Sequence, residues 1–358
     1  SGAVYDAAFT AQPAVTVRDE GGNTVTSPTY VVTATVSAGT VVGTGNTTLT
    51  ATTSGGTATF EGLGITGTPG DYTITYEISV GATTVSTSQL ITVTKASQSA
   101  LEVTSTDGAF NTPLTLETSG GSGIGAVSWS VANGTATGCA EVGGALTSTS
   151  AGTCTVTATK AQDTNYNAVS STATTVTIAK ANQTTSLTLA TTTVTYGQTL
   201  TLSGSGGNGD GALSYSVSSG TCTILVAVLT PGNAGSTCQI QITRATSINY
   251  LAKTSDPISI TITQAAQSIS FADPTDRAWS ASTFVLSPTA SSSLTVTLAS
   301  NDTAVCTVAS GSFIITMVKA GTCSLTASQE GDTNYSAATD VTQTFEISKA
   351  TQAAFSVS

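Results

Sequence analysis

Residues 321–337 decide the fold, and they read Gly-Thr-Cys-Ser-Leu-Thr-Ala-Ser-Gln-Glu-Gly-Asp-Thr-Asn-Tyr-Ser-Ala. The first half alternates apolar Cys323, Leu325 and Ala327 with hydroxyl side chains. This period of two is the pattern of a β-strand with one buried face and one wet face. The second half is rich in Gly, Asp and Asn, which are typical turn residues. The stretch therefore predicts a strand followed by a tight loop.

The same pattern occurs three times at constant spacing. Asn-Tyr-x-Ala begins at residues 165, 249 and 334, with a cysteine 12 residues before each tyrosine. A tetrapeptide Lys/Gln-Ala-x-Gln begins 14 residues after each of these tyrosines and also at residue 95. Because the landmarks return every 84 or 85 residues, we expect one structural unit to be built repeatedly. The expected units are 1–95, 96–180, 181–264 and 265–349, with 350–358 opening a further repeat.

Period-two alternation also marks the rest of the chain. Residues 72–78, 127–131 and 258–262 alternate apolar and polar side chains, and Gly-, Asn- and Pro-rich turns separate such runs. Seven or so short strands in a unit of this length predict a Greek-key β-sandwich. The linkers are short and contain neither proline nor a run of glycines. We therefore expect an all-β chain of tandem sandwiches in an extended rod, on the order of 140 Å long.

Composition excludes several classes of function. The 358 residues carry 9 Lys and Arg against 20 Asp and Glu, so a basic face for nucleic acid is not expected. The absence of histidine removes Ser-His-Asp and Cys-His catalysis and His-ligated zinc. The longest apolar run, residues 224–229, has the length of a strand and is far below the ~18 residues of a membrane helix. We expect neither an enzyme nor membrane insertion of this segment.

The six cysteines fall two to a unit, and only in the last three units. Six cysteines allow 15 pairings, and one pair per repeated unit is the simplest. Free structural thiols, or metal or redox chemistry, are the alternatives, although no clustered CxxC pairs support a metal site. Disulfides indicate an oxidising, extracellular location. The expected bonds are Cys139–Cys154, Cys222–Cys238 and Cys306–Cys323.

The aromatic residues divide into structural candidates and one candidate contact residue. Tyr166, Tyr250 and Tyr335 keep a fixed distance from a cysteine, which favours a buried ring with its hydroxyl bonded to backbone. Stacking on a sugar is their alternative role. Trp129 lies ten residues before a cysteine and is expected in a core. Trp279 lies outside this register and is the candidate for contact with a ligand.

Acidic and basic residues at the repeated positions have two interpretations each. Asp163 and Asp332 open Asp-Thr-Asn-Tyr and could bind Ca²⁺ or cap a turn. Calcium takes six to eight oxygen ligands, so capping is favoured and no other cofactor is expected. Lys95, Lys180 and Lys349 could form isopeptide bonds, but each falls at the end of a last strand, and the disulfides already staple the unit.

The chain resembles bacterial surface proteins that carry tandem immunoglobulin-like (Ig-like) repeats. Residues 320–338 resemble a widespread cysteine-containing repeat of bacterial exoproteins and adhesins, and 151–154 and 163–166 share its pattern. The third unit departs from the pattern, with Ser247 in place of the Asp. Residues 9–13, 17–23 and 58–67 resemble the invasin and intimin type of Ig-like module. The resemblance implies Ig-like sandwiches in a secreted or cell-surface protein of a bacterium.

Three functions are compatible with this resemblance. The first is a non-catalytic spacer whose partners are the neighbouring repeats of the same chain. The second is direct binding of a glycan or a host or cell-surface protein through exposed loops or Trp279. The third is self-assembly into a filament or surface layer, because sandwich edges with few charges can pair as strands.

Overall fold

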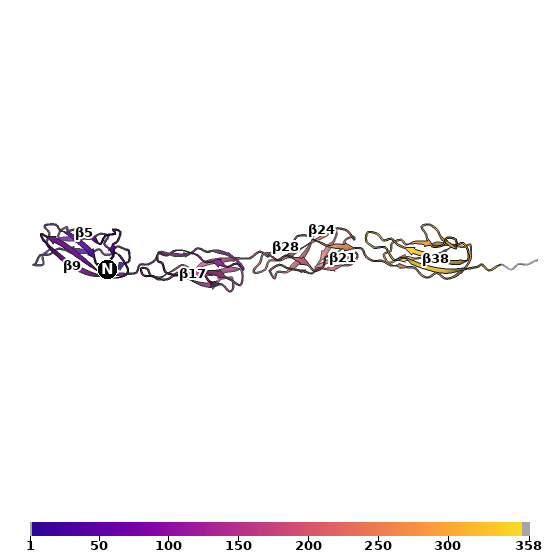
Figure 1. Cartoon of the computed structure of the whole chain (residues 1–358), viewed down its shortest axis with the longest axis horizontal. Coiled ribbons are helices and arrows are strands. Elements are labelled where there is room, and N and C mark those ends of the chain that lie inside the picture. Colours follow the sequence, from indigo (N-terminus) through magenta and orange to yellow (C-terminus); the bar gives the residue numbers. More distant parts are fainter. Residues whose placement is uncertain (1, 353–358) are drawn as a thin grey trace, which may run out of the picture. The chain divides into compact units, whose positions relative to one another are not determined.

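A computed structural model describes residues 2–352. The regular secondary structure of these residues consists of β-strands (Figure 1). The chain divides into two compact units, Ser1–Ala181 and Asn182–Ser358. Each unit holds two sets of strands, here called modules one and two in the first unit and three and four in the second. Each module encloses its own cluster of buried apolar side chains.

Module one packs a five-stranded sheet, in the order β1-β9-β8-β3-β5, against the short pairs β2-β6 and β4-β7. Its core contains Phe60, Leu63 and Ile74, which are at most 1% exposed. The strands are β1 (Ala3–Val4), β2 (Ala14–Thr16), β3 (Val31–Val36), β4 (Thr40–Val41), β5 (Thr48–Thr52), β6 (Thr57–Thr59), β7 (Ile65–Thr66), β8 (Gly70–Val80) and β9 (Thr83–Thr94).

Module two faces the sheet β11-β19-β17-β14, with β18 paired to β17, against the sheet β12-β16-β15 and the pair β10-β13. Leu146, Val156 and Val176 are fully buried between the layers. The strands are β10 (Leu101–Val103), β11 (Asp107–Ala109), β12 (Leu114–Thr115), β13 (Thr118–Gly120), β14 (Val127–Asn133), β15 (Ala140–Val142), β16 (Ala145–Thr147), β17 (Gly152–Lys160), β18 (Val169–Ser170) and β19 (Thr174–Ala179).

Module three repeats this arrangement with shorter and more interrupted strands. The sheet β24-β27-β28, with β29 paired to β27, faces β22-β26-β25, and β20-β23 and β21-β30 form pairs. Leu229 and Ile240 are fully buried. The strands are β20 (Thr188–Leu189), β21 (Thr193–Thr195), β22 (Leu200–Thr201), β23 (Gly204–Ser205), β24 (Leu213–Gly220), β25 (Thr223–Leu225), β26 (Val228–Thr230), β27 (Cys238–Arg244), β28 (Lys253–Thr254), β29 (Ile258–Ser259) and β30 (Thr261–Thr263).

Module four faces β32-β39-β38-β35 against β33-β37-β36, with the pair β31-β34. The predicted alternation is confirmed in β38, where Cys323, Leu325 and Ala327 are fully buried. The predicted opening of a further repeat at 350–358 lies mostly outside the described residues. The strands are β31 (Ile269–Ser270), β32 (Arg277–Ala278), β33 (Phe284–Val285), β34 (Thr289–Ala290), β35 (Thr297–Ser300), β36 (Cys306–Val308), β37 (Ile314–Met317), β38 (Gly321–Ser328) and β39 (Val341–Ser348).

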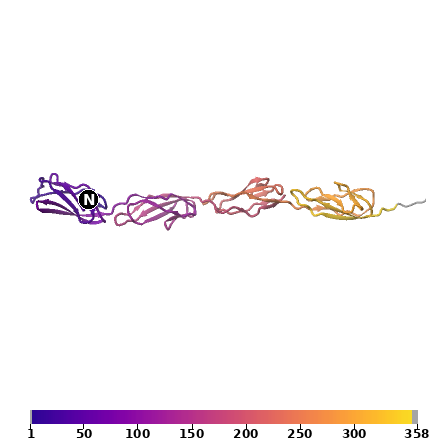
Figure 2. The ribbon, with the colours of Figure 1, turned by 45° about the horizontal axis from the view of Figure 1, so that its top comes forward.

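All four modules share one feature of their topology. An early strand lies parallel to the last strand of its module, as in β1 with β9 and β32 with β39. Some strands that are adjacent in a sheet are separated in sequence by strands of the facing layer, as β15 and β16 separate β14 from β17. Figure 2 shows the ribbon of the modules from a second direction. Crossing between layers in this way is the Greek-key connection of Ig-like sandwiches, which confirms the predicted all-β tandem sandwich class. Among residues 2–352, no helix is long and apolar enough to cross a membrane.

The apolar run 224–229 is not one strand, contrary to what its length suggests. It is the hairpin β25–β26, which turns at Val226 and Ala227 with φ values of 45° and 63°. Module two makes its β15–β16 hairpin at Gly143 and Gly144, which reach positive φ without steric cost. Val226 is 90% exposed because it stands at the tip of the turn.

Candidate functional site

Each of modules two to four contains one disulfide, and all six cysteines are bonded. In every case the second cysteine lies at or near the start of a buried strand, at Cys154, Cys238 or Cys323. The Cα atoms of the bonded pairs are 5.6–5.9 Å apart. The bonds join Cys139 to Cys154, Cys222 to Cys238 and Cys306 to Cys323. With both sulfurs in covalent bonds, these cysteines act as cross-links within their own modules.

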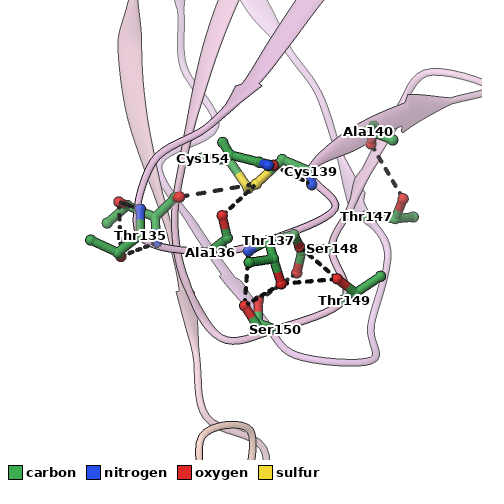
Figure 3. Close-up of a disulfide and its surroundings, with 12 residues drawn as sticks. Thr135, Ala136, Thr137, Cys139, Ala140, Thr147, Ser148, Thr149, Ser150 and Cys154 are labelled. Atoms are coloured by element: carbon green, nitrogen blue, oxygen red, sulfur yellow. Dashed lines mark hydrogen bonds between the residues drawn. A yellow bond between two sulfur atoms is a disulfide. The ribbon is translucent and has the colours of Figure 1, made fainter.

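Hydroxyl side chains surround the disulfide of module two (Figure 3). The Thr137 N–H donates to Ser150 Oγ at 2.9 Å, and the Thr149 N–H donates to Thr137 O at 2.8 Å. Thr135 and Thr153 exchange two backbone-to-hydroxyl bonds of 3.0 and 2.9 Å. These bonds satisfy the irregular backbone on either side of the cross-link, which is what a structural staple requires.

A glutamine of the Lys/Gln-Ala-x-Gln tetrapeptide is a hydrogen-bonding hub in each of modules two to four, and it is buried in modules two and three and half-buried, as Gln267, in module four. Gln98 and Gln183 are 9% and 7% exposed. The amide nitrogen donates to the carbonyl of the residue after the repeated tyrosine, 68 or 69 positions along the chain. The bonds are Gln98 to Asn167 at 2.8 Å, Gln183 to Leu251 at 2.7 Å and Gln267 to Ser336 at 2.8 Å. Sequence reasoning treated this glutamine as linker, although the constant separation is a signal that could have found it.

The amide oxygen of the same glutamine holds a glycine turn. Gln98 Oε1 accepts the Gly123 N–H at 3.0 Å, and Gln183 Oε1 accepts the corresponding N–H groups of Asn208 and Gly209. A Cβ built on Gly123 would lie 2.4 Å from Asp163 Oδ2, so a larger residue there would displace that carboxylate. The glutamine thus ties the tetrapeptide, this turn and the Asn-Tyr loop into one end of the module.

In the first unit, the chain passes from module one to module two by strand pairing with that loop. The Ala96 N–H donates to Asn165 O, and the Asn167 N–H donates to Ala96 O, both at 2.9 Å. Lys95 Nζ donates to Asp163 O at 2.6 Å. Because both polar groups of Ala96 are bonded, the linker is paired backbone and not a free hinge.

The junction between modules three and four in the second unit has the same bonds. The Ala265 N–H donates to Asn334 O at 2.8 Å, and the Ser336 N–H donates to Ala265 O at 3.0 Å. Gln264 Nε2 donates to Asp332 O at 2.6 Å, as the lysine of the first unit does to its aspartate carbonyl. Lys and Gln can therefore replace each other at this position, because both supply an N–H donor to the same carbonyl.

The repeated tyrosines lie at these junctions. Tyr166 meets Tyr5 of module one with ring centroids 5.4 Å apart and an interplanar angle of 78°. Tyr335 meets Tyr196 of module three at 5.5 Å and 79°. Both repeated tyrosines are half-buried. The prediction of a buried ring is corrected for these two tyrosines: each ring is half-buried and packs on the preceding module, in the edge-to-face geometry that aromatic pairs prefer.

Two structural candidates remain, Trp129 and Tyr250. Trp129 of β14 is half-buried against the core of module two, where its backbone pairs with Ala158. Tyr250 is half-buried, and its carbonyl oxygen accepts the Ser247 N–H and the Thr246 hydroxyl at 2.9 Å.

Trp279 lies in a register that sequence reasoning missed. It is 39% exposed, its indole Nε1 donates to Val318 O at 3.2 Å, and its backbone N–H donates to Ser348 O at 2.9 Å. An aromatic residue makes the same backbone bond to the end of the last strand in every module. These bonds are Tyr5 to Thr94, Phe110 to Ala179, Tyr196 to Thr263 and Trp279 to Ser348. The residue type varies, so a search for identical motifs does not align these positions.

Asp163 caps the loop that carries Tyr166. Its Oδ1 accepts the N–H groups of Asn165 and Tyr166 at 2.8 Å, and its Oδ2 accepts the Ile124 N–H at 2.6 Å. These bonds, that from Ile124 foremost, lower the pKa of the Asp163 carboxyl below its ordinary 3.8. Asp332 accepts the two corresponding N–H groups of its own loop at 2.8 Å. In the described residues, no three His, Cys, Asp or Glu side chains cluster as metal ligands.

Fold and cross-links define the chain as a tandem array of Ig-like β-sandwich modules. No protein-family model matches the sequence, and no curated protein matches it. Among solved structures, it is similar to the ICAM-5 D1–D4 ectodomain fragment, with a TM-score of 0.34, 10% identity and coverage of 98% of this chain and 97% of that one. For Sidekick-1 immunoglobulin domains 1–4 the values are 0.25, 12%, 98% and 96%, and for Drosophila N-cadherin EC1-4 they are 0.25, 10%, 89% and 92%. Likeness at this level carries no argument about function.

Proposed function

We propose that the chain is a non-catalytic spacer segment of a larger extracellular protein, built from modules that end at Lys95, Lys180, Gln264 and Lys349. The observation that carries this proposal is the junction, which recurs in both compact units. Each has strand pairing by the linker alanine, a Lys or Gln bond to an aspartate carbonyl, and a tyrosine pair. A junction with these contacts resists bending, which is the property a spacer needs.

The repeated groups of the cysteine-containing modules have structural uses. The cysteines form cross-links, the glutamines bond loops together, and Asp163 and Asp332 cap their turns. This use of the repeated polar residues supports a mechanical role over a chemical one.

Three disulfides support an oxidising location outside the cytosol. Because residues 320–338 resemble repeats of bacterial exoproteins, the proposed location is the cell surface or the secreted proteins of a bacterium. In that setting the partners of these modules are the neighbouring repeats of the same chain.

Solution scattering of the full chain tests the spacer role. We expect a maximum dimension on the order of 140 Å that does not change with concentration. Inserting Gly-Gly after Ala96 should shorten the mean dimension, because it breaks the pairing with the Asn-Tyr loop. The matched control places Gly-Gly between Gly143 and Gly144, at a hairpin tip, and should leave the dimension unchanged. A compact profile for the unaltered chain would refute the proposal.

Self-assembly is a second candidate, supported by strand β9. Residues 83–90 of β9 are exposed and uncharged, and β1 pairs only with Val93 and Thr94 at its far end. An apolar groove of about 350 Å³, lined in part by Val15, Tyr76 and Val85, opens beside it. Such an edge accepts an added strand. Sedimentation should then show concentration-dependent association that Ser88→Lys abolishes, whereas a monomer at every concentration would remove this candidate.

A further inference from the structure

We propose that the exposed ring of Trp279 is a docking surface for the Asn-Tyr loop of an Ig-like module placed after Lys349. This inference rests on the proposed spacer function and assigns the partner of one surface. It replaces the expectation that Trp279 contacts a free ligand.

Backbone register is the first argument. Trp279 follows a short strand, β32, that runs parallel to β39. The Trp279 N–H donates to Ser348, the last residue of β39. Tyr5 and Tyr196 have the same position in modules one and three. In both of those modules, this aromatic ring receives the tyrosine of the module that follows, at 5.4 and 5.5 Å.

The second argument is the state of the rings. Tyr5 and Tyr196, which have a following module against them, are half-buried, whereas Trp279 is 39% exposed. The bond from Trp279 Nε1 to Val318 O fixes the indole in place before any partner arrives. A large ring held in one orientation suits an edge-to-face partner, because less conformational freedom is lost when the partner binds.

The third argument is the linker beside the ring. Lys349 and Ala350 follow β39 as Lys95 and Ala96 follow β9, and both are exposed. At the first junction, the lysine supplies a donor for an aspartate carbonyl and the alanine pairs with the Asn-Tyr loop. Module four thus presents together all three elements of a junction: the ring, the donor and the strand.

Fluorescence of Trp279 tests the proposal. The reporter is the full chain with Trp129→Phe, so that Trp279 is the only tryptophan. The extended protein adds, after Ala350, a second copy of residues 266–349 that carries Trp279→Phe. We expect the extension to shift the emission to shorter wavelength and to reduce quenching by acrylamide. Tyr335→Ala in the added copy alone is the matched control and should restore both values.

Three outcomes would overturn the proposal. The first is unchanged emission and quenching in an extended protein whose added copy has formed its disulfide and adds β-sheet signal to the circular dichroism. The second is a concentration-dependent shift in the unextended protein, which would assign the ring to a second copy. The third is saturable protection of the unextended protein by a glycan, which would assign it to a ligand.

Scattering of the same samples separates this inference from the spacer function. If the maximum dimension grows by one module while Trp279 stays exposed, the docking surface is wrong and the spacer stands. If the dimension does not grow, the spacer function itself fails.

Discussion

Tyr5 and Tyr166 belong to different modules, yet their rings meet at 5.4 Å and 78°. Tyr5 reaches this position because its backbone follows the strand that pairs with the end of β9, directly before the linker. Tyr166 reaches it because Asp163 caps the loop on which it stands. The contact therefore joins a residue bonded to the last strand of one module with a capped loop of the next.

The first prediction concerns the energy of this ring pair. Tyr5→Ala, Tyr166→Ala and the double variant form a double-mutant cycle, whose coupling free energy we expect at about 0.5–1.5 kcal/mol. The free energies come from hydrogen exchange of the Ala96 and Asn167 amides, since both depend on the junction. The cycle Tyr5→Ala with Trp129→Ala is the control, because these rings lie in separate cores. Equal coupling in both cycles would show that the contact has no energetic weight.

The second prediction concerns Lys95. Because Gln264 makes the corresponding bond to Asp332 O at 2.6 Å, Lys95→Gln should keep the first junction intact. Lys95→Ala removes the donor to Asp163 O and should raise hydrogen exchange at the Ala96 amide. Removing one such bond costs about 1 kcal/mol, which is roughly a fivefold change in protection. If Gln and Ala behave alike, the bond has no role in holding the junction.

The third prediction concerns the buried glutamine. Gln98→Ala leaves the Asn167 carbonyl and the buried Gly123 N–H without their partner, and an unsatisfied buried N–H costs about 1–3 kcal/mol. We expect lower free energy of unfolding for module two, measured by hydrogen exchange in urea. Ser97→Ala, at an exposed neighbouring position, should stay within about 0.5 kcal/mol of the unaltered protein. Equal effects at the two positions would contradict the hub role.

The fourth prediction concerns acid. Backbone N–H bonds hold the pKa of Asp163 below 3.8 in the folded state. Its contribution to stability is therefore fully present above that ordinary value and is lost as pH falls through the lower folded pKa. Protection of the Tyr166 amide should decline in this window. Asp163→Asn should lose protection of the Tyr166 amide already at neutral pH, and this protection should decline less than that of the wild type as the pH falls. A difference in protection between wild type and variant that stays constant across the window would refute the assignment.

The fifth prediction concerns the disulfides. Cys139→Ser with Cys154→Ser should destabilise module two by about 3 kcal/mol, the value for closing a loop of this length. The effect is the loss of free energy of unfolding of module two, measured by hydrogen exchange of its amides at increasing temperature. Module one has no cysteine and is an internal control, since reductant should leave its protection unchanged. Alkylation without reductant should modify no thiol, and uptake of six alkyl groups would contradict the bonds.

Much of the fold could be predicted from local pattern. Alternation in residues 321–328 depends only on which side chains lie on the buried face of a strand, so it is visible in the sequence. Constant spacing of the Cys, Tyr and Lys/Gln landmarks likewise marks one repeated backbone path. The hairpin at Val226 and Ala227 was not predicted, because apolar residues at a turn carry no local signal of the chain reversal.

The junction could not be predicted in the same way. Lys95 and Asp163 bond across 68 positions, and Gln98 and Asn167 across 69. Neither pair forms a local pattern. The ring that receives Tyr166 or Tyr335 is a tyrosine in both cases, whereas the same backbone position holds Phe110 in module two and Trp279 in module four, so no single residue type marks it in the sequence.

The sequence alone determined that the chain is built from repeated two-layered β modules, because hydrophobic period and repeat spacing are properties of the order of residues. Only the tertiary structure decided what the repeated tyrosines and glutamines do. The partners of these residues come from different layers and different modules. In each module an early strand pairs in parallel with the last strand, and this pairing brings Trp279 and its counterparts Tyr5 and Tyr196 to the end where a neighbouring module attaches.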